Sequence, residues 1–421
     1  MVKQSSEELL LFYQNHLLND IVPFWDRAVD RDYGGVFTCF NNEGTKLLSK
    51  DKYTWSQGRF IWCWSTLYEM MKAGKIHGEL DRYAEEAQQA VSFLQQHVLL
   101  ENGHCAFLLS KEGRKKEPVL GKGYDTSFYA DAFVILGFAK YAKVFQEVSL
   151  LDWILDLYDS VQRRLERGVF KCEPYPIPEG YQAHGVSMIM LNVTQELSDT
   201  LEYLQHPRAE EIQRQSVEYM KKIMDVFCDK EYRMAETLTI QGERDASLLS
   251  RHMNPGHTIE CMWFVLHTAQ KSKQTSYVKK AGEVVKKAFE LGWDEEKGGL
   301  LRFVDFQGGP PKGEWKDDPH TSLIASTWDY KLWWPHSEAL YTTLLFYTLT
   351  KEDIYWREYK RVHEYTFHTF PNPNEDIGEW IQIRGRDGKP VEQVVALPVK
   401  DPYHILRNLL LIIELLYNQK D

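Results

Sequence analysis

The sequence lacks the long apolar segments and the concentrated positive charge that mark proteins of membranes or nucleic acids. Its longest apolar run, residues 409–413, is far too short to span a bilayer. The formal net charge is −11, and the longest basic run covers only residues 114–116, which is typical of a solvated loop. Residues 1–6 lead toward an amphipathic helix without the apolar core of a signal peptide. We therefore expect no membrane or nucleic-acid partner, and a cytoplasmic location.

Several chemical motifs are also missing. The six cysteines form no Cys-x-x-Cys pair, which argues against zinc ribbons and redox motifs. The sequence has no His-x-His or His-Glu-x-x-His pattern for a metal and no phosphate-binding Gly-x-x-x-x-Gly-Lys-Ser/Thr loop. The Gly-x-Ser-x-Gly nucleophile motif is absent as well. We expect neither a metal nor a cofactor.

What the sequence has in abundance is aromatic residues and helical periodicity. It contains 13 Trp, 23 Tyr and 20 Phe. Most of these should pack in the core, but aromatic surfaces also suit stacking on sugar rings, so carbohydrate is a candidate ligand. Apolar residues recur at helical spacing through most of the chain. The expected helices span residues 6–28, 54–73, 79–100, 124–143, 150–167, 183–204, 206–228, 257–271, 273–291, 329–350, 353–369 and 402–418.

A weak internal repeat links these helices. Residues 30–37 (DRDYGGVF) and 294–301 (DEEKGGLL) each place a Gly-Gly turn and a short apolar segment after a helix, and 102–107 and 167–170 are shorter echoes. Glycine permits positive φ, and the apolar residues that follow suit a short strand or hairpin. Six such units predict an all-α (α/α)6 barrel formed by one domain over residues 1–421. The alternative, an open solenoid, needs polar terminal caps that are not evident.

Residues 254–260 predict the start of a helix that carries two ionisable side chains. Asn254 can cap the helix, and Pro255 suits its first position. His257 and Glu260 are three residues apart, so they project from one face. A structural hydrogen bond is the plainer alternative to a functional role for this pair.

Polar and aromatic clusters also begin the other even-numbered helices of the expected series. If these helices form the inner ring, their N-terminal ends share one rim, where aligned helix dipoles would favour a developing oxyanion. The rim should therefore hold a pocket. The clusters contain the residues that we expect to bind the substrate: Tyr53, Trp55, Tyr124, His184, Asn192, Asn254, Trp328, Trp334 and Arg407. They also contain Gln57, Asp125, Phe128, Met188, Lys331, Trp333 and Tyr403.

Residues 301–328 form the longest expected loop, with Gly-Gly-Pro-Pro at 308–311. Because the loop leads into an even-numbered helix, it should overhang the same rim. It is either a lid over the pocket or a passive surface loop.

Histidines on different helices, glutamates and an arginine remain as the chemical groups of the rim. Two histidines that face one carbon suit proton transfer next to a carbonyl, because imidazole titrates near neutral pH. Arg59 could hold the enolate oxygen, and Glu260 could orient His257. This set predicts a 1,2-epimerase or isomerase of an aldose. Two alternatives stay open: a glycoside hydrolase that uses Glu260 and Glu338, or Asp125 and Glu338, and a non-catalytic binding protein.

Several long segments, in order, resemble the N-acylglucosamine 2-epimerase family. They are 32–39 (DYGGVFTC), 52–59 (KYTWSQGR), 190–192 (MLN), 251–257 (RHMNPGH), 331–338 (KLWWPHSE) and 403–407 (YHILR), and the resemblance covers nearly the whole chain. It implies an (α/α)6 barrel, often a homodimer, that acts on an open-chain sugar through an enediolate. It also implies that His257 and His404 are the acid–base pair, with Arg59, Glu260 and Glu338 in support.

Finer features of the resemblance bear on the substrate. Residues 187–193 (SMIMLNV) resemble the N-acylglucosamine enzymes, whereas cellobiose 2-epimerases carry Ser-Met-Asn-Thr-His-x-His there. Val399 stands where the cellobiose enzymes have Trp, although 400–404 (KDPYH) resembles them and 312–327 looks like an insertion. We expect interconversion of N-acetylglucosamine and N-acetylmannosamine, with a cellobiose 2-epimerase or an aldose–ketose isomerase as alternatives. Some relatives are activated by ATP, but no phosphate motif supports ATP binding here.

Overall fold

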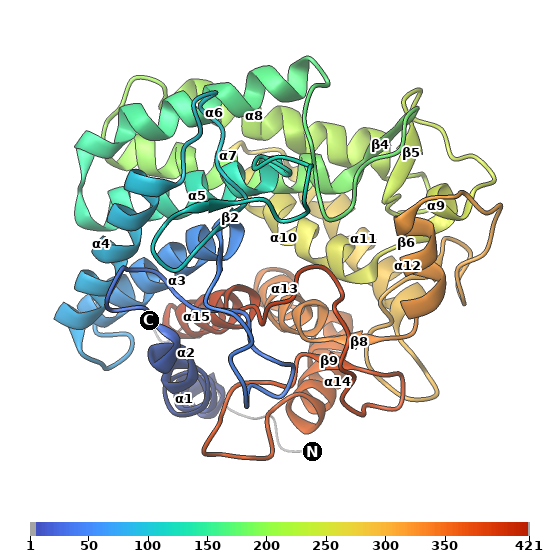
Figure 1. Cartoon of the computed structure of the whole chain (residues 1–421). Helices are drawn as coiled ribbons and strands as arrows, with labels where there is room; N and C mark the ends of the chain where they lie inside the picture. The colour runs from blue at the N-terminus through green and yellow to red at the C-terminus, as the bar shows by residue number, and fades with distance from the viewer. Residues whose placement is uncertain (1–5, 420–421) are drawn as a thin grey trace.

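The computed structural model describes residues 6–419. Residues 1–5, to which the expected absence of a signal peptide refers, and residues 420–421 lie outside the described part. Within it, helices form an inner and an outer ring (Figure 1). The inner ring consists of α3 (Thr54–Lys72), α5 (Phe128–Phe145), α7 (His184–Tyr203), α10 (Pro255–Lys271), α13 (Trp333–Thr350) and α15 (Tyr403–Tyr417).

The outer ring alternates with the inner ring along the chain. Each inner helix packs against its two inner neighbours, and α15 packs against α3, which closes the ring. The expected (α/α)6 barrel is therefore confirmed, and the open solenoid is wrong. The outer helices are α1 (Ser6–Asn15) with a π-helical turn (His16–Ile21) and α2 (Val22–Ala28), α4 (Leu80–His97), α6 (Leu151–Glu166) after a 3-10 turn (Val148–Leu150), α8 (Ala209–Lys222) with a π-helical turn (Ile223–Phe227), α11 (Thr275–Gly292) and α14 (Asp353–Thr369).

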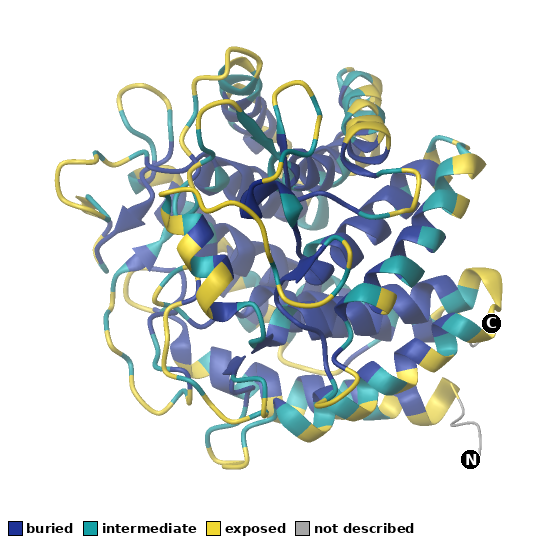
Figure 2. Ribbon diagram, turned by 90° about the vertical axis from the view of Figure 1, so that its right-hand side faces the viewer, coloured by how far each residue is buried: buried dark blue, intermediate teal, exposed yellow. Residues whose placement is uncertain are grey.

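Burial distinguishes the two rings. The sequence of α13 (WWPHSEALYTTLLFYTLT) is buried on almost every side, as a helix surrounded by other helices requires. In contrast, α4 buries one stripe that includes Tyr83, Ala87, Ala90, Val91 and Leu94, at helical spacing. Figure 2 accordingly shows dark blue central helices and peripheral helices with yellow outer faces. The buried apolar residues of both rings belong to one continuous core.

Short antiparallel strands lead into four of the inner helices at one end of the barrel. At most one residue separates the ends of strands β1, β4, β6 and β8 from the starts of α3, α7, α10 and α13. The pairing of these strands therefore fixes the first turn of each helix in place. The sheets are β1 (Lys52–Tyr53) with β2 (Leu108–Leu109) and β3 (Lys115–Lys116), β4 (Tyr181–Ala183) with β5 (Thr237–Thr239), β6 (His252–Met253) with β7 (Val304–Asp305), and β8 (Lys331–Leu332) with β9 (Ile383–Arg384).

The internal repeat forms two matching buried ion pairs. Lys52 Nζ donates to Asp30 Oδ2 at 2.8 Å, and Lys331 Nζ donates to Asp294 Oδ2 at 3.0 Å. Each lysine also donates to a carbonyl of the Gly-Gly turn that follows its aspartate, and the glycines of both turns have positive φ. Each pair thus ties the end of an outer helix to the strand that precedes an inner helix.

One inner helix starts later than its periodicity predicts. The helix expected from residue 124 begins at Phe128, because Ser127 is extended, with φ −156°, and bridges to Cys172. Tyr124 consequently lies in the preceding loop.

The expected loop 301–328 contains regular structure. Besides β7 it holds α12 (Pro319–Thr327), whose first free N–H groups donate to Asp318 Oδ1 at 2.9 and 3.0 Å. A further short helix, α9 (Leu248–Arg251), is capped by Ser247. Helices this short carry too little periodicity to be recognised in the sequence.

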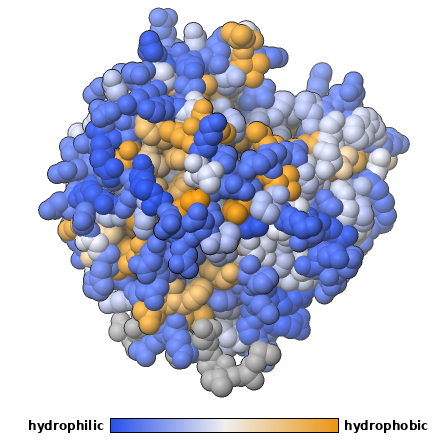
Figure 3. Space-filling view, turned by 60° about the horizontal axis from the view of Figure 1, so that its bottom comes forward, coloured by the Kyte–Doolittle hydropathy of each residue, from blue (hydrophilic) through white to orange (hydrophobic). Residues whose placement is uncertain are grey.

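The surface of the barrel is mainly polar on the face seen in Figure 3, where hydrophobic groups lie between blue, hydrophilic side chains. Across residues 6–419, no helix combines the length and apolar character needed to cross a membrane.

Candidate active site

A pocket lies at the end of the barrel where the inner helices begin. Its cavity measures about 240 Å³. Side chains from the first turns of α3, α7, α10, α13 and α15 line it, together with the segments 172–178 and 395–399. The predicted rim is therefore present. Of the expected site residues, those on the pocket wall are Trp55, Arg59, Asn254, His257, Glu260, Trp334 and His404.

His257 enters the pocket from the first turn of α10. Asn254 Oδ1 accepts the backbone N–H of His257 at 3.1 Å, and Pro255 occupies the first helical position, as the sequence predicts. The His257 side chain remains 33% exposed. Its Nδ1 donates to Glu236 Oε2 at 2.9 Å, because a carboxylate can only accept. The ring thus keeps Nε2 for a ligand.

Glu236 therefore occupies the role that the sequence assigned to Glu260. It lies just before β5, and the pairing of β5 with β4 holds it at the start of α7, where its carboxylate reaches His257 on α10. Burial would raise the pKa of Glu236, but His257 and a second histidine, His184, hold it well below its usual range. Conversely, burial would lower the pKa of His257, but Glu236 raises it above its ordinary value. The pair favours an imidazolium at His257.

His404 enters from the first turn of α15. Its Nδ1 donates to Glu338 Oε1 at 2.7 Å, and its side chain is 10% exposed. Glu338 also accepts from Trp263 Nε1 at 2.9 Å and from Asn408 Nδ2 at 2.8 Å. His404 is thus fixed like His257, with Nδ1 on a buried carboxylate and Nε2 left free for a ligand.

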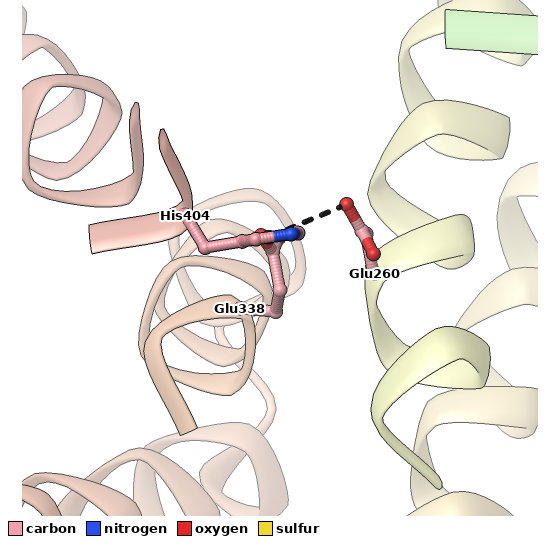
Figure 4. A group of neighbouring side chains, drawn as sticks. All are labelled: Glu260, Glu338 and His404. Carbon is pink, nitrogen blue, oxygen red and sulfur yellow. Dashed lines mark hydrogen bonds and ion pairs between the residues drawn. The ribbon is translucent and has the colours of Figure 1, made fainter. Parts of the chain in front are cut away.

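Glu260 belongs to the group around His404 and not to His257. Arg407 Nη2 lies 2.5 Å from Oε1 of both Glu260 and Glu338. His404 Nδ1 is 3.8 Å from Glu260 Oε1, the ion pair drawn in Figure 4. Glu260 was expected to support His257 because the two residues share a helical face, but the buried guanidinium draws its carboxylate toward α15.

The same carboxylates bear on two alternative chemistries. Glu260, Glu338 and His404 lie close enough together to suit a metal ion, yet Arg407 already supplies the positive charge between the two carboxylates. A glycoside hydrolase needs one carboxyl group that stays protonated. Although burial would raise the pKa of Glu338, Arg407 and His404 lower it overall. Asp125, the other carboxylate considered, bonds to His104 and Lys171 outside the pocket wall.

Trp334 is a neighbour of both histidines. The centre of its ring system is 5.0 Å from the ring centre of His257 and 5.6 Å from that of His404. A ligand resting on the indole would therefore lie within reach of both imidazoles. Two-sided access to a single carbon is the geometry that inversion by two acid–base groups requires.

Arg59 is held rigidly on the pocket wall. Its Nη1 donates to Asp401 Oδ1 at 3.2 Å. The guanidinium carbon lies 4.0 Å from the ring centre of Phe133, 4.8 Å from that of Trp55 and 4.9 Å from that of Tyr403. Stacked between aromatic rings, the guanidinium can present its remaining N–H groups to an oxygen of a ligand.

Several expected binding residues do not line the pocket. Tyr53 packs against Phe107, and Trp328 packs against a small cluster around Phe303. Tyr124 is 42% exposed in the loop before α5, because that helix starts at Phe128. Spacing places each of them near a helix start, but it does not determine where the side chain points.

Three further expected residues lie behind the wall. His184 is fully buried behind Glu236. Asn192, two turns along α7, lines a separate cavity at the opposite half of the barrel interior. Arg407 borders that second cavity too and reaches the pocket only through the carboxylates it binds.

A network of contacts covers the pocket, and the sequence predicted only the overhang of residues 301–328. Tyr175 Oη donates to the carbonyl oxygen of Val395. Arg302 Nη2 donates to the same oxygen at 2.9 Å, and its Nη1 donates to Thr327 Oγ1 at 2.8 Å. The ring of His320 stacks on Tyr175 at 5.3 Å. Three loops are thereby joined, so the expected overhang of residues 301–328 is present. The sequence held no signal for these contacts between irregular segments.

The closed ring and the two-histidine pocket define an (α/α)6-barrel enzyme that acts on sugars. The chain belongs to the N-acylglucosamine 2-epimerase family, whose model matches residues 35–408. The N-acylglucosamine 2-epimerase of Bos taurus is 30% identical over 421 residues, which cover 95% of this chain and 90% of the bovine protein. The family resemblance is confirmed, and the chain is a carbohydrate epimerase or isomerase.

Solved structures share the fold. Cellobiose 2-epimerase from Bacillus thermoamylovorans matches with a TM-score of 0.75 at 19% identity, over 97% of this chain and 99% of its own. A family 76 glycoside hydrolase (mannosidase) from Bacteroides thetaiotaomicron matches with a TM-score of 0.55 at 9% identity, over 99% of both chains. At such identities the likeness concerns the barrel alone, and the chemistry must come from the site.

Proposed function

We propose that the protein interconverts N-acetylglucosamine and N-acetylmannosamine by moving the proton at C2. The observation that carries this proposal is that His257 and His404 both lie beside Trp334 on the pocket wall, each with Nδ1 bound to its own carboxylate. Two imidazoles fixed in this way offer Nε2 to the two faces of one sugar carbon.

The proton balance of the reaction follows from this arrangement. A neutral imidazole on one face takes the C2 proton of the open-chain sugar, and the C–H electrons form a C1=C2 enolate with negative charge on O1. The imidazolium on the other face then donates its proton to C2 as the C1 carbonyl re-forms. C2 is inverted, and the two histidines have exchanged protonation states, which prepares the site for the reverse reaction.

The supporting residues have distinct tasks in this mechanism. Arg59 donates to the developing oxyanion, which lowers the barrier because the donor is already oriented. Glu338 fixes His404, Glu260 and Arg407 balance the charge around that pair, and Trp334 carries the sugar ring. Trp55 and Asn254 complete the wall nearest the sugar.

The lining of the pocket favours an N-acylated monosaccharide. Met188, Ile189, Leu397 and Val399 give the wall an apolar stretch, against which an acetyl methyl group would be buried favourably. Tyr175, Val395 and Arg302 also line the pocket and are bonded to one another, and in this proposal they limit the room for a second sugar ring. The bovine relative bears the name N-acylglucosamine 2-epimerase, which agrees with this choice.

Incubation with N-acetylglucosamine in heavy water tests the proposal. We expect N-acetylmannosamine with deuterium at C2, seen by proton NMR. Parallel incubations with mannose and cellobiose separate the alternatives, because a ketose product would indicate an aldose–ketose isomerase and epimerised cellobiose a cellobiose 2-epimerase. Absence of C2 exchange in N-acetylglucosamine would contradict the proposal.

Two further expectations complete the proposed function. The family resemblance implies a homodimer. Light scattering can check this by measuring the molar mass of the protein in solution. A cytoplasmic location can be checked by fractionation of cells that express the chain. Neither expectation affects the chemistry above.

A further inference from the structure

Glu236 faces a second imidazole on the side away from the pocket. His184 Nδ1 lies 3.6 Å from Glu236 Oε1, while His257 Nδ1 binds the other oxygen, Oε2. His184 has no exposed surface and is not part of the pocket wall. Within residues 6–419, neither of its ring nitrogens has a hydrogen-bond partner, and neither has Glu236 Oε1. A small rotation would join the two groups.

The backbone holds these two residues in register. His184 is the first residue of α7, and its N–H donates to the Glu236 carbonyl at 2.9 Å. Ala183 pairs with Thr237 between β4 and β5. The His184 ring also meets Phe227 edge-on at 5.7 Å. The position of His184 behind Glu236 is therefore built into the sheet and not an accident of a mobile side chain.

Buried polar atoms without partners are costly, so their retention calls for an explanation. A phenylalanine could fill the same space among aromatic neighbours without that cost. Within the described chain, the equivalent carboxylate beside His404 is supported by permanent donors: Glu338 accepts from Arg407, Trp263 and Asn408. Beside His257, the side chain in the corresponding position behind the carboxylate is His184.

We propose that His184 is a positioning residue that acts through Glu236, by drawing the outer oxygen of that carboxylate and sharing its negative charge. This inference rests on the proposed role of His257 as an acid–base group. Without His184, the whole charge of Glu236 would act on His257 and hold its proton too firmly. With His184, the buried His184–Glu236–His257 chain lets His257 release and regain a proton during each turnover.

Other ionisable groups also face this chain. Glu260 and Arg302 act on His257 from α10 and from the segment before β7. In the described chain, the basic groups within 4 Å of the Glu236 carboxylate are His257 and His184. The charge of Glu236 also affects the pKa of four groups on other elements: Tyr129 on α5, His252 on β6, Cys261 on α10 and His320 on α12. None of these four side chains forms an ion pair or hydrogen bond with Glu236 Oε1 in the described chain.

The substitution His184→Phe separates a functional role from a structural one. We expect an unchanged or higher Tm, because two unpartnered nitrogens are removed and the ring still packs. We expect kcat/KM for N-acetylglucosamine to fall by about tenfold or more, the usual effect of a group that orients an imidazole through its partner. The midpoint of the His257 imidazole titration, followed by NMR, should move to higher pH.

A matched control is His363→Phe. His363 lies on the outer helix α14, and its Nε2 is likewise buried without a partner in the described chain. This variant should keep the His257 midpoint and the wild-type kcat/KM. An unmoved His257 midpoint in His184→Phe, or a lower Tm with a loss of rate that is equal at every pH, would overturn the inference. The NMR titration needs no substrate, so its result is independent of whether the proposed epimerisation fails.

Discussion

Arg407 Nη2 and His404 Nδ1 share one acceptor, Oε1 of Glu338, at 2.5 and 2.7 Å. A permanent cation and an imidazole thus converge on a single buried oxygen. Since Arg407 is shared with Glu260, it offsets part of the charge of Glu338, and His404 binds to the same carboxylate. The environment of His257 differs, because Glu236 is balanced by imidazoles alone.

Arg407→Met should be among the most destabilising single substitutions in the barrel. It leaves the buried carboxylates Glu260 and Glu338 without their shared cation, and removal of one partner of a buried ion pair typically costs about 3–5 kcal/mol. Urea denaturation at neutral pH measures the change in the free energy of unfolding. As a control, Lys389→Met removes an exposed ion pair with Asp387 and should leave the free energy of unfolding unaltered.

The same substitution should change how stability depends on pH. The pKa of Glu338 is lowered in the folded protein, so its contribution is present above the pKa of the unfolded state and is lost as the pH falls through the folded value. The wild type should therefore lose stability on acidification more steeply than Arg407→Met. Equal slopes for both proteins would mean that Arg407 does not sustain the charge of Glu338.

His257→Ala and His404→Ala should each lose at least about a hundredfold in the rate of epimerisation, the usual scale of general acid–base catalysis. Each variant retains one imidazole, so each should still exchange the C2 hydrogen of one epimer with heavy water without inverting it. The epimer that exchanges should differ between the two variants. NMR of both sugars measures this, and full epimerisation by either variant would refute the two-histidine mechanism.

Glu236→Gln should lower the pH at which His257 titrates. Glu236 raises the pKa of His257 in the folded protein, so loss of its charge moves the midpoint down. The stability that this pair contributes is present below the unfolded pKa of His257 and is lost as the pH rises through the folded value. Glu260→Gln serves as the comparison, and a larger shift in that variant would restore Glu260 as the partner of His257.

Arg302→Met should loosen the network of contacts that covers the pocket. It removes the bonds from Arg302 to Val395 and Thr327, and the loss of such bonds should cost about tenfold in kcat/KM for N-acetylglucosamine. Cellobiose turnover, measured relative to N-acetylglucosamine, should rise because the space above the pocket opens. Tyr330→Phe removes the exposed bond to Gln393 between the same two segments. A similar change in preference in this control would argue against a specific role for Arg302.

The sequence predicted the helices well because their cores are periodic. It also placed His257 and His404 at the rim. The cap at Asn254 indicates that His257 lies in a first turn, and His404 lies at the start of the last periodic segment. Glu236 escaped prediction because it stands in an irregular segment where no spacing relates it to His257. The contacts that Tyr175 and Arg302 make with Val395 were not predicted, for the same reason.

Some residues that the sequence predicted to bind the substrate do not line the pocket, and the cause is related. Asn192 was expected at the rim, but about two helical turns separate it from the start of α7, roughly 12 Å along the axis. It therefore reaches the second cavity at the other half of the interior. Distance along a helix is as decisive as the face on which a residue lies.

The closure of the inner ring through α15 and α3 has a topological consequence. The first and last pairs of helices meet by packing and not through a covalent connection. The barrel therefore has no intrinsic starting point, and the order of its helical pairs along the chain is one of several cyclic orders that would build the same enclosure around the same pocket.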